Sequence, residues 1–396
     1  MHQTITGDSK RTRFVAVFLL GLGAIVSAHP HAQTTSPLTP HAGEIVATVR
    51  LLTYNVFGVY KPFGEDERCN FRYTHFGDIL ARRNPVSDVI GLQEYFGNSF
   101  LGLFPGNCNP EPLRESITAT GRYLTTERHP CVPLLFEFPP YVNGCRFQPR
   151  KGLDGGIGLL TQHHIESAES WRWNEHTNQL RSQGFLFARI RLVGTTSNTP
   201  LRLDVYVVHI LGECTPRPSC QRHELEQLAG EIAELSALSG NPVIVMGDFN
   251  LDGPRRRADV SSFPEYRHIL ETLRNPRDLW LEAHPAGVAE RGLTTDECPL
   301  VRPVFGSPEL EPDTFQCSGS TTLCGCTGKR IDYMFLITDP SMTNNPFDVR
   351  FAHPDDVRVV RFFELDDGPV RVSVSDHYGV DAVLQVRKPQ TVAPTN

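Results

Sequence analysis

Residues 243–250 are Val243-Ile244-Val245-Met246-Gly247-Asp248-Phe249-Asn250, and this stretch decides how the rest of the chain is interpreted. Four consecutive apolar residues predict a strand that is buried on both faces. Because alternate residues of an extended chain point to the same side, Asp248 and Asn250 are expected to face one pocket, with Phe249 turned into the core. A carboxylate and a carboxamide suit a hard divalent cation or a phosphate. The alternative is an ordinary turn, since Gly, Asp and Asn favour turns.

The composition is that of a soluble globular protein with a large core. The chain has 396 residues, of which 39% are hydrophobic and 21% are charged, which suits one large domain or two small ones. The net charge of -7 argues against a general nucleic-acid binder, which is usually basic. Only five of the 38 basic residues are Lys, so nearly all positive charge is guanidinium, the better partner for phosphates.

The N-terminus predicts export. Basic residues at 10, 11 and 13 precede a 15-residue apolar run from Phe14 to Ala28, which is too short for a comfortable membrane span. We therefore expect a secretory signal peptide over residues 1–32, a flexible leader over 33–44 and a secreted or periplasmic protein. The alternative for the apolar run is a membrane anchor.

Ten cysteines follow the expected signal peptide. An even number in an exported chain predicts disulfide bonds, with Cys214 and Cys220 closing a short loop. Cys317, Cys324 and Cys326 lack the paired Cys-x-x-Cys units of a zinc site, so zinc is disfavoured.

The hydrophobic pattern predicts a sheet-rich protein. Helical spacing of apolar residues indicates a helix over 221–238, a short helix is expected over 75–83, and residues 255–278 are expected to be partly helical. Strands are expected at 49–56, 88–94, 155–160, 184–190, 203–209, 243–246, 331–336 and 378–384. Their loose alternation with helices, with several hairpins, favours an α/β sandwich over a simple parallel sheet. We expect one catalytic domain over residues 45–388 and a disordered tail over 389–396.

Polar residues stand at the ends of six of these apolar strands. Each is unremarkable alone, because polar residues often terminate strands. Polar groups that gather where strands leave a core, however, make a binding site. The candidates are Asn55, Glu94, His209, Asp248 with Asn250, Asp332, and Asp376 with His377.

The order of these motifs resembles the endonuclease/exonuclease/phosphatase superfamily, which includes deoxyribonuclease I, abasic-site endonucleases, inositol-polyphosphate 5-phosphatases and bacterial sphingomyelinases. The resemblance covers about residues 48–386. It implies a four-layer α/β/β/α sandwich and metal-dependent cleavage of a phosphoester. The motifs are Thr53-Tyr54-Asn55-Val56, Leu92-Gln93-Glu94, Gly247-Asp248-Phe249-Asn250, Arg330-Ile331-Asp332-Tyr333 and Ser375-Asp376-His377-Tyr378.

Within this superfamily, Glu94-Tyr95-Phe96 looks like the sphingomyelinase pattern, with an aromatic residue that faces lipid. Gly97, where an Asp is common, and the string Ile210-Leu211-Gly212-Glu213 depart from that pattern. A hairpin over 357–375 would place Phe362 and Phe363 near a membrane, although a place in the core is the favoured alternative. We expect a phospholipid or membrane-surface substrate and a monomer without an obligate protein partner.

Two other functions compete with a sphingomyelinase or phospholipase C-type hydrolase. One is an exported endonuclease similar to deoxyribonuclease I, for which Arg255-Arg256-Arg257 would contact DNA, unless this run is simply a solvated loop. The other is a non-catalytic binding protein on the same fold.

The resemblance also implies a division of roles. Glu94, helped by Asn55, is expected to bind Mg²⁺, with Mn²⁺ or Ca²⁺ as further candidates. His377 is expected to act as general base on water. The remaining expected catalytic residues are Asp332 or Asp376 as the partner of His377, Asp248 and Asn250 to orient water and phosphate, and His209 to hydrogen-bond the phosphoryl group or protonate the leaving oxygen.

Overall fold

The computed structural model describes residues 43–56, 69–95, 113, 115, 124–126, 156–173, 183–193, 200–212, 219–287, 294, 309–310, 329–365, 371–373, 375 and 377–388. The expected signal peptide, most of the expected leader, and the tail lie outside these residues, as do Phe96, Gly97, Cys214 and Asp376. The pairing of Cys214 with Cys220 therefore stays a prediction. No helix among the described residues is long and apolar enough to cross a membrane.

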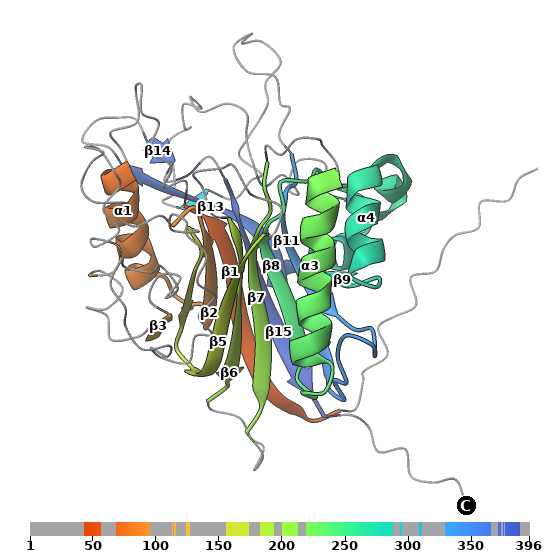
Figure 1. Ribbon diagram of the computed structural model, residues 1–396. Helices are drawn as coiled ribbons and strands as arrows, with labels where there is room; N and C mark the ends of the chain where they lie inside the picture. Colours follow the sequence, from red (N-terminus) through yellow and green to blue (C-terminus); the bar gives the residue numbers. More distant parts are fainter. Residues whose placement is uncertain are drawn as a thin grey trace, which may run out of the picture. The chain divides into compact units, whose positions relative to one another are not determined.

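The described residues form two mixed sheets, of nine and six strands (Figure 1). The larger sheet contains one parallel pair, β1 with β2, and its other pairs are antiparallel. Its strands, in spatial order, are β10 (Glu309–Leu310), β13 (Val357–Leu365), β15 (Gly379–Arg387), β1 (Ile45–Asn55), β2 (Val89–Gln93), β4 (Gly158–Thr161) and β3 (Leu124–Thr126), with β12 (Asp348–Arg350) beside β15 and β14 (Arg371–Ser373) beside β13.

The smaller sheet also has one parallel pair, β7 with β8, among antiparallel neighbours. Its spatial order is β5 (His164–Arg172), β6 (Gly184–Arg191), β7 (Arg202–His209), β8 (Val243–Asp248), β11 (Asp332–Ile337) and β9 (Arg277–Asp278). The antiparallel pairing confirms the expectation of hairpins rather than a simple parallel sheet.

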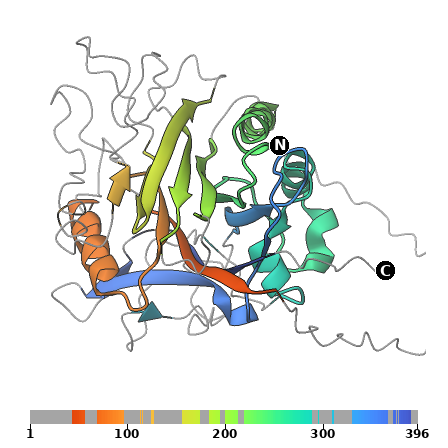
Figure 2. The same cartoon turned by 90° about the horizontal axis from the view of Figure 1, so that it is seen from below.

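Helices cover the outer face of each sheet (Figure 2). Helix α1 (Cys69–Arg82) packs on the larger sheet through Tyr73, Phe76 and Leu80. Helices α3 (Ser219–Ser236) and α4 (Pro264–Thr272) pack on the smaller sheet. The short elements are α5 (Leu279–Ala283) and the 3₁₀ helices η2 (Arg257–Ser262) and η4 (Pro354–Asp356). The result is the expected four-layer α/β/β/α sandwich.

Alternation along the strands assigns each side chain to a layer. In β8, Ile244 and Met246 enter the core between the two sheets, whereas Val243 and Val245 pack under α3 and α4. A strand buried on both faces is therefore apolar at every position, which is why the run at 243–246 is continuous. Asp248 continues the row of Ile244 and Met246, so its side chain lies at the end of the core between the sheets.

Two local elements differ from expectation, and one alternative is decided by the structure. Helix α1 begins at Cys69 rather than at residue 75. Strand β5 was not expected, because only Ala168, Ser170 and Trp171 of its nine residues are buried and its sequence shows no regular apolar alternation. β13 and β14 pair as the expected hairpin, and the favoured core position is confirmed for Phe362, which packs against Tyr54 and Phe76 rather than at a membrane-facing tip.

Candidate active site

Three strands of the smaller sheet bring polar side chains to one level. His209 at the end of β7 is paired with Asp248 at the end of β8, and Asp248 is paired with Asp332 at the start of β11. The parallel pair ends together, and the antiparallel strand begins at that same edge. This register places residues that are far apart in the sequence in one row across the sheet.

The larger sheet contributes Asn55, Glu94 and His377 from the facing edge. Asn55 ends β1 opposite Gln93 of β2, and His377 lies just before β15, the other neighbour of β1. Glu94 follows β2 with a left-handed φ of 53°, and the Tyr73 hydroxyl donates a hydrogen bond of 3.1 Å to its carbonyl oxygen. The chain therefore turns sharply at Glu94, which takes this residue out of the strand.

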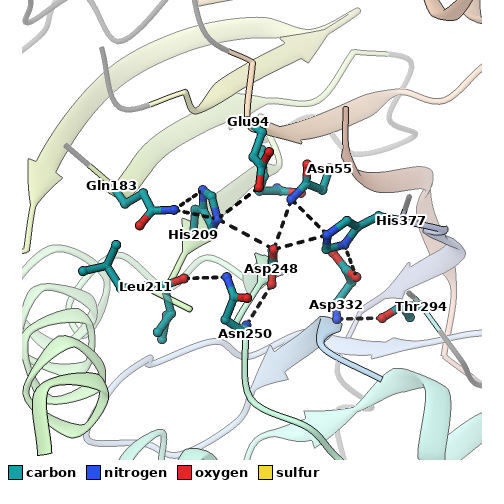
Figure 3. Close-up of polar contacts among 12 residues, drawn as sticks. Asn55, Glu94, Gln183, His209, Leu211, Asp248, Asn250, Thr294, Asp332 and His377 are labelled. Carbon is teal, nitrogen blue, oxygen red and sulfur yellow. Dashed lines mark hydrogen bonds and ion pairs between the residues drawn. The ribbon is translucent and has the colours of Figure 1, made fainter. Parts of the chain in front are cut away.

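Asp248 is the centre of the cluster (Figure 3). Its Oδ2 accepts a hydrogen bond of 3.1 Å from Asn55 Nδ2. His209 Nε2 lies 3.7 Å from this oxygen and His377 Nε2 lies 3.8 Å from it. Glu94 Oε1 lies 4.0 Å from His209 Nε2. Side chains from both sheets thus converge on one buried carboxylate.

Asn250 reaches the cluster by a turn, which corrects the argument from strand alternation. Its φ is 50°, a left-handed conformation that Asn tolerates, and its backbone N–H donates a 2.8 Å hydrogen bond to Asp248 Oδ1. Its side-chain amide donates to the Ile210 carbonyl at 2.8 Å. A Cβ atom at Gly212 would lie 2.8 Å from Asn250 Oδ1, so the glycine leaves room for this side chain. The turn at Asn250 is therefore part of the polar cluster and not an alternative to it.

His377 is held by a carboxylate. Its Nδ1 lies 2.9 Å from Asp332 Oδ2, and its Nε2 lies 3.4 Å from Asn55 Nδ2. The backbone around this pair is also fixed, because Thr294 Oγ1 accepts the N–H of Asp332 and Ser375 Oγ accepts the N–H of His377. Of the two expected partners of His377, Asp332 occupies the position, and Asp376 lies outside the described residues.

His209 is held by a neutral amide. The Gln183 side-chain nitrogen lies 3.0 Å from His209 Nε2 and 3.4 Å from Nδ1. The indole N–H of Trp173 donates to the His209 carbonyl at 2.9 Å. Both ring and backbone of His209 are therefore restrained from the side of β5 and β6.

Burial changes the proton affinity of Asp248. Removal from water, followed by the negative charge of Asp332, raises the pKa of Asp248 to about 8. The positive charge of a protonated His377 and the hydrogen bond from the Asn250 N–H act in the opposite direction. A cation in the site would likewise favour the ionised carboxylate.

The donor set fits a hard divalent cation. Ligand atoms of Glu94, His209 and Asp248 lie within 4.8 Å of one another, and so do those of Asp248, Asp332 and His377. Carboxylate and amide oxygens are the ligands that Mg²⁺ prefers. Asp332 Oδ1 is buried without a hydrogen-bond partner among the described residues, as expected for an oxygen available to a cation or water. The expected ligands Glu94 and Asn55 thus gain Asp248 as a neighbouring oxygen donor.

The structure brings together seven of the eight residues expected from the sequence, and the eighth, Asp376, is not described. Sequence reasoning missed Gln183, Thr294 and Ser375. Ser375 belongs to the motif Ser375-Asp376-His377-Tyr378, so the sequence pattern could have identified it. Gln183 and Thr294 are single polar residues in segments without a motif, and no pattern marks them.

The arginine run after the central motif lies at the surface. Arg256 and Arg257 are exposed and Arg255 is half-buried. The backbone N–H of Arg257 donates to the Pro285 carbonyl, which fixes the start of η2.

The chain is similar to proteins of known activity or structure. A sphingomyelinase from Dictyostelium discoideum is 20% identical over 314 residues, which are 63% of this chain and 64% of that protein. The chain therefore matches slightly less than two thirds of the length of this relative.

The fold is similar to that of solved structures. A beta toxin from Staphylococcus aureus superposes with a TM-score of 0.51 at 14% identity, over 86% of this chain and 99% of the toxin. A variant of the same toxin with bound magnesium ions gives a TM-score of 0.50 at 13% identity, over 86% of this chain and all of the toxin. The profile of the Endonuclease/Exonuclease/phosphatase family matches residues 52–377, a span that runs from the first central strand to the last histidine of the site. The chain belongs to the Endonuclease/Exonuclease/phosphatase family, a family of phosphodiesterase- and nuclease-type hydrolases.

Proposed function

We propose that this protein is a metal-dependent phosphodiesterase of the sphingomyelinase or phospholipase C type, which cleaves a phospholipid head group by in-line attack of water. One observation carries the proposal: two imidazoles, one from each sheet, flank the Asp248 carboxylate at 3.7 and 3.8 Å. Two facing histidines supply a base for the attacking water and an acid for the leaving oxygen.

The metal would be Mg²⁺, held by Glu94 with help from Asn55 and with Asp248 close by. When bound, the cation offsets the charge of the phosphate and polarises it. Mg²⁺ is supported by the oxygen-rich donor set and by the magnesium ions bound to the similar toxin. Mn²⁺ or Ca²⁺ would use the same oxygens.

His377 is the proposed general base. Because Nδ1 faces the Asp332 carboxylate at 2.9 Å, this nitrogen carries the proton and Nε2 presents its lone pair. The Asn55 amide on the Nε2 side at 3.4 Å is a donor, which is consistent with an unprotonated Nε2. Nε2 takes a proton from water as the water oxygen attacks phosphorus, and Asp332 stabilises the resulting imidazolium.

His209 is the proposed donor to the phosphoryl group or the leaving oxygen. Its Nε2 faces the same space as His377 Nε2, since both lie less than 4 Å from Asp248 Oδ2. Asp248 lies between the two rings, and the Asn250 N–H donates to its other oxygen. Asp248 and Asn250 would orient water and phosphate oxygens. Donors placed where charge develops supply much of the acceleration in such reactions.

The lipid substrate is supported by the sphingomyelinase relative, by the acidic net charge and by the Glu94-Tyr95-Phe96 string. The N-terminal pattern of basic residues followed by an apolar run supports a secreted or periplasmic protein. An endonuclease is the second candidate, because Arg256 and Arg257 are exposed shortly after the central motif. A nuclease would lose activity steeply as salt rises.

The test offers both substrates to the mature protein. Purified protein is incubated with sphingomyelin vesicles and, separately, with plasmid DNA, each with Mg²⁺ and with chelator. The proposal expects chelator-sensitive release of phosphocholine and an intact plasmid. Nicked plasmid with untouched lipid would replace it with the endonuclease, and Arg255→Ala, Arg256→Ala and Arg257→Ala would then be the informative variants. If neither phosphocholine nor nicked plasmid forms, both proposed substrates are wrong.

A further inference from the structure

We infer that Gln183 is a positioning residue for His209: its side-chain amide holds the imidazole in place during proton transfer to the leaving oxygen. This inference rests on the proposed function for the role of His209. The contact itself is independent of that function and is the starting point.

The contact is close, and the neighbouring carboxylates lie farther away. Gln183 Nε2 lies 3.0 Å from His209 Nε2, whereas Asp248 Oδ2 and Glu94 Oε1 lie 3.7 and 4.0 Å from the same ring nitrogen. Gln183 is buried, and its Oε1 has no hydrogen-bond partner among the described residues. A buried amide oxygen without a partner is costly, which argues that this amide has a use beyond packing.

The backbone holds Gln183 against the site. Its carbonyl accepts the N–H of Trp173, whose indole N–H donates to the His209 carbonyl at 2.9 Å. A Cβ atom at the next residue, Gly184, would lie 1.8 Å from the Trp171 carbonyl oxygen, so only glycine allows β5 and β6 to approach here. Gln183 and His209 are thus fixed relative to one another by the same pair of strands.

An amide suits a ring that changes its proton state. As His209 protonates the leaving oxygen, the P–O bond breaks, the leaving group departs with that proton, and the hydroxide from water stays on phosphorus while His377 keeps the other proton. The His209 nitrogen changes from donor to acceptor in this step. After this step His209 Nε2 is an acceptor, and the Gln183 side-chain N–H group 3.0 Å away can donate to it, whereas a carboxylate such as Asp332 can only accept. Gln183 therefore holds the ring in the state that follows transfer, and before transfer the single Nε2 proton is directed at the leaving oxygen.

The experiment replaces the amide and keeps its shape. Gln183→Met is compared with the wild type and with Gln162→Met, whose amide donates to the Ser87 carbonyl away from the cluster. Each is assayed on sphingomyelin, whose leaving group is a poor alkoxide, and on 4-nitrophenyl phosphocholine, whose phenolate leaves without help from an acid.

Gln183→Met is expected to lower kcat/KM for sphingomyelin about tenfold to a hundredfold, because it forfeits part of the acceleration from a positioned acid. The nitrophenyl substrate should lose less than about threefold by the same reasoning. Gln162→Met should change neither. Equal losses on both substrates, or none on either, would overturn the inference.

A spectroscopic measurement tests the contact between Gln183 and His209 without relying on enzyme activity. In protein with ¹⁵N-labelled histidine and chelator, Gln183→Met and Gln183→Ala should shift the ring signals of His209 and leave those of His377 in place. Unchanged His209 signals would overturn the inference whatever the kinetics. If the wild type hydrolyses neither substrate, the proposed function is wrong, and the ring signals alone decide whether Gln183 positions His209.

Discussion

His377 and His209 stand at similar distances from one carboxylate but have different partners. His377 Nδ1 meets the Asp332 carboxylate at 2.9 Å, and His209 meets the Gln183 amide at 3.0 Å. A carboxylate fixes the tautomer and stabilises the charged ring, which a base requires. A neutral amide orients the ring without stabilising its charge, which suits a group that must give its proton away. The difference in partners assigns the two roles.

The largest expected effect is the loss of the base. His377→Ala should lower kcat about 10³-fold, within the range that general acid–base catalysis contributes, with the fold intact. Steady-state rates on sphingomyelin measure it, and circular dichroism checks the fold. His353→Ala removes an exposed histidine at the start of η4 and should have no effect. An unaltered rate in His377→Ala would remove this residue from the mechanism.

Asp332→Asn gives His377 the kind of partner that His209 has. The amide keeps the shape but no longer stabilises the imidazolium, so kcat should fall about a hundredfold with little change in KM. Asp355→Asn, an exposed residue of η4, is the matched control. If Asp332→Asn retains full activity, the carboxylate is not what distinguishes the two histidines.

Glu94→Gln tests the metal side of the site. Removing the carboxylate charge should raise the Mg²⁺ concentration needed for half-maximal activity about tenfold or more. Calorimetric titration of Mg²⁺ into the protein measures the same loss without turnover. Glu44→Gln changes an exposed carboxylate paired with Lys388 and serves as control. Equal Mg²⁺ affinity in Glu94→Gln and wild type would contradict the assignment.

Asp248→Asn tests how the buried carboxylate between the histidines affects the free energy of unfolding. The pKa of Asp248 is raised from about 4 to about 8, so the folded state keeps a proton that the unfolded chain releases between these values. The free energy of unfolding of metal-free protein should therefore fall with rising pH, by about 1 kcal/mol per pH unit from this group.

The asparagine variant lacks this titration, so its stability relative to the wild type should increase from pH 5 to pH 7.5. Urea unfolding in chelator at both pH values measures the difference. A constant difference between the two proteins at both pH values would show that Asp248 is already ionised in the folded state.

Much of this arrangement follows from the sequence because strand ends share an edge. The apolar runs before Asn55, Glu94, His209 and Asp248 predict strands, and polar residues after such strands gather at one rim. That His209, Asp248 and Asp332 lie in one row could not be predicted from the sequence, because the register of β7, β8 and β11 depends on packing across the sandwich.

Other features depend on contacts that no local pattern records. The residue types at 247–250 allow a turn, but the hydrogen bond that fixes the Asn250 side chain runs to the Ile210 carbonyl after the neighbouring strand. Phe362 lies in the core, as its residue type favours, but its partners there, Tyr54 and Phe76, come from distant segments of the chain. Gln183 gains its position from the close approach of β5 and β6. Each is set by a partner more than ten residues away.

The leaving-group dependence of two alanine variants tests the division of roles most directly. Wild type, His377→Ala and His209→Ala are assayed on sphingomyelin and on 4-nitrophenyl phosphocholine, and the ratio of kcat/KM values is compared. His377→Ala should lose activity on both substrates to the same extent, because both need an activated water. His209→Ala should lose activity on sphingomyelin and retain most of it on the nitrophenyl substrate. Equal ratios for the two variants would contradict the assignment of base to His377 and donor to His209.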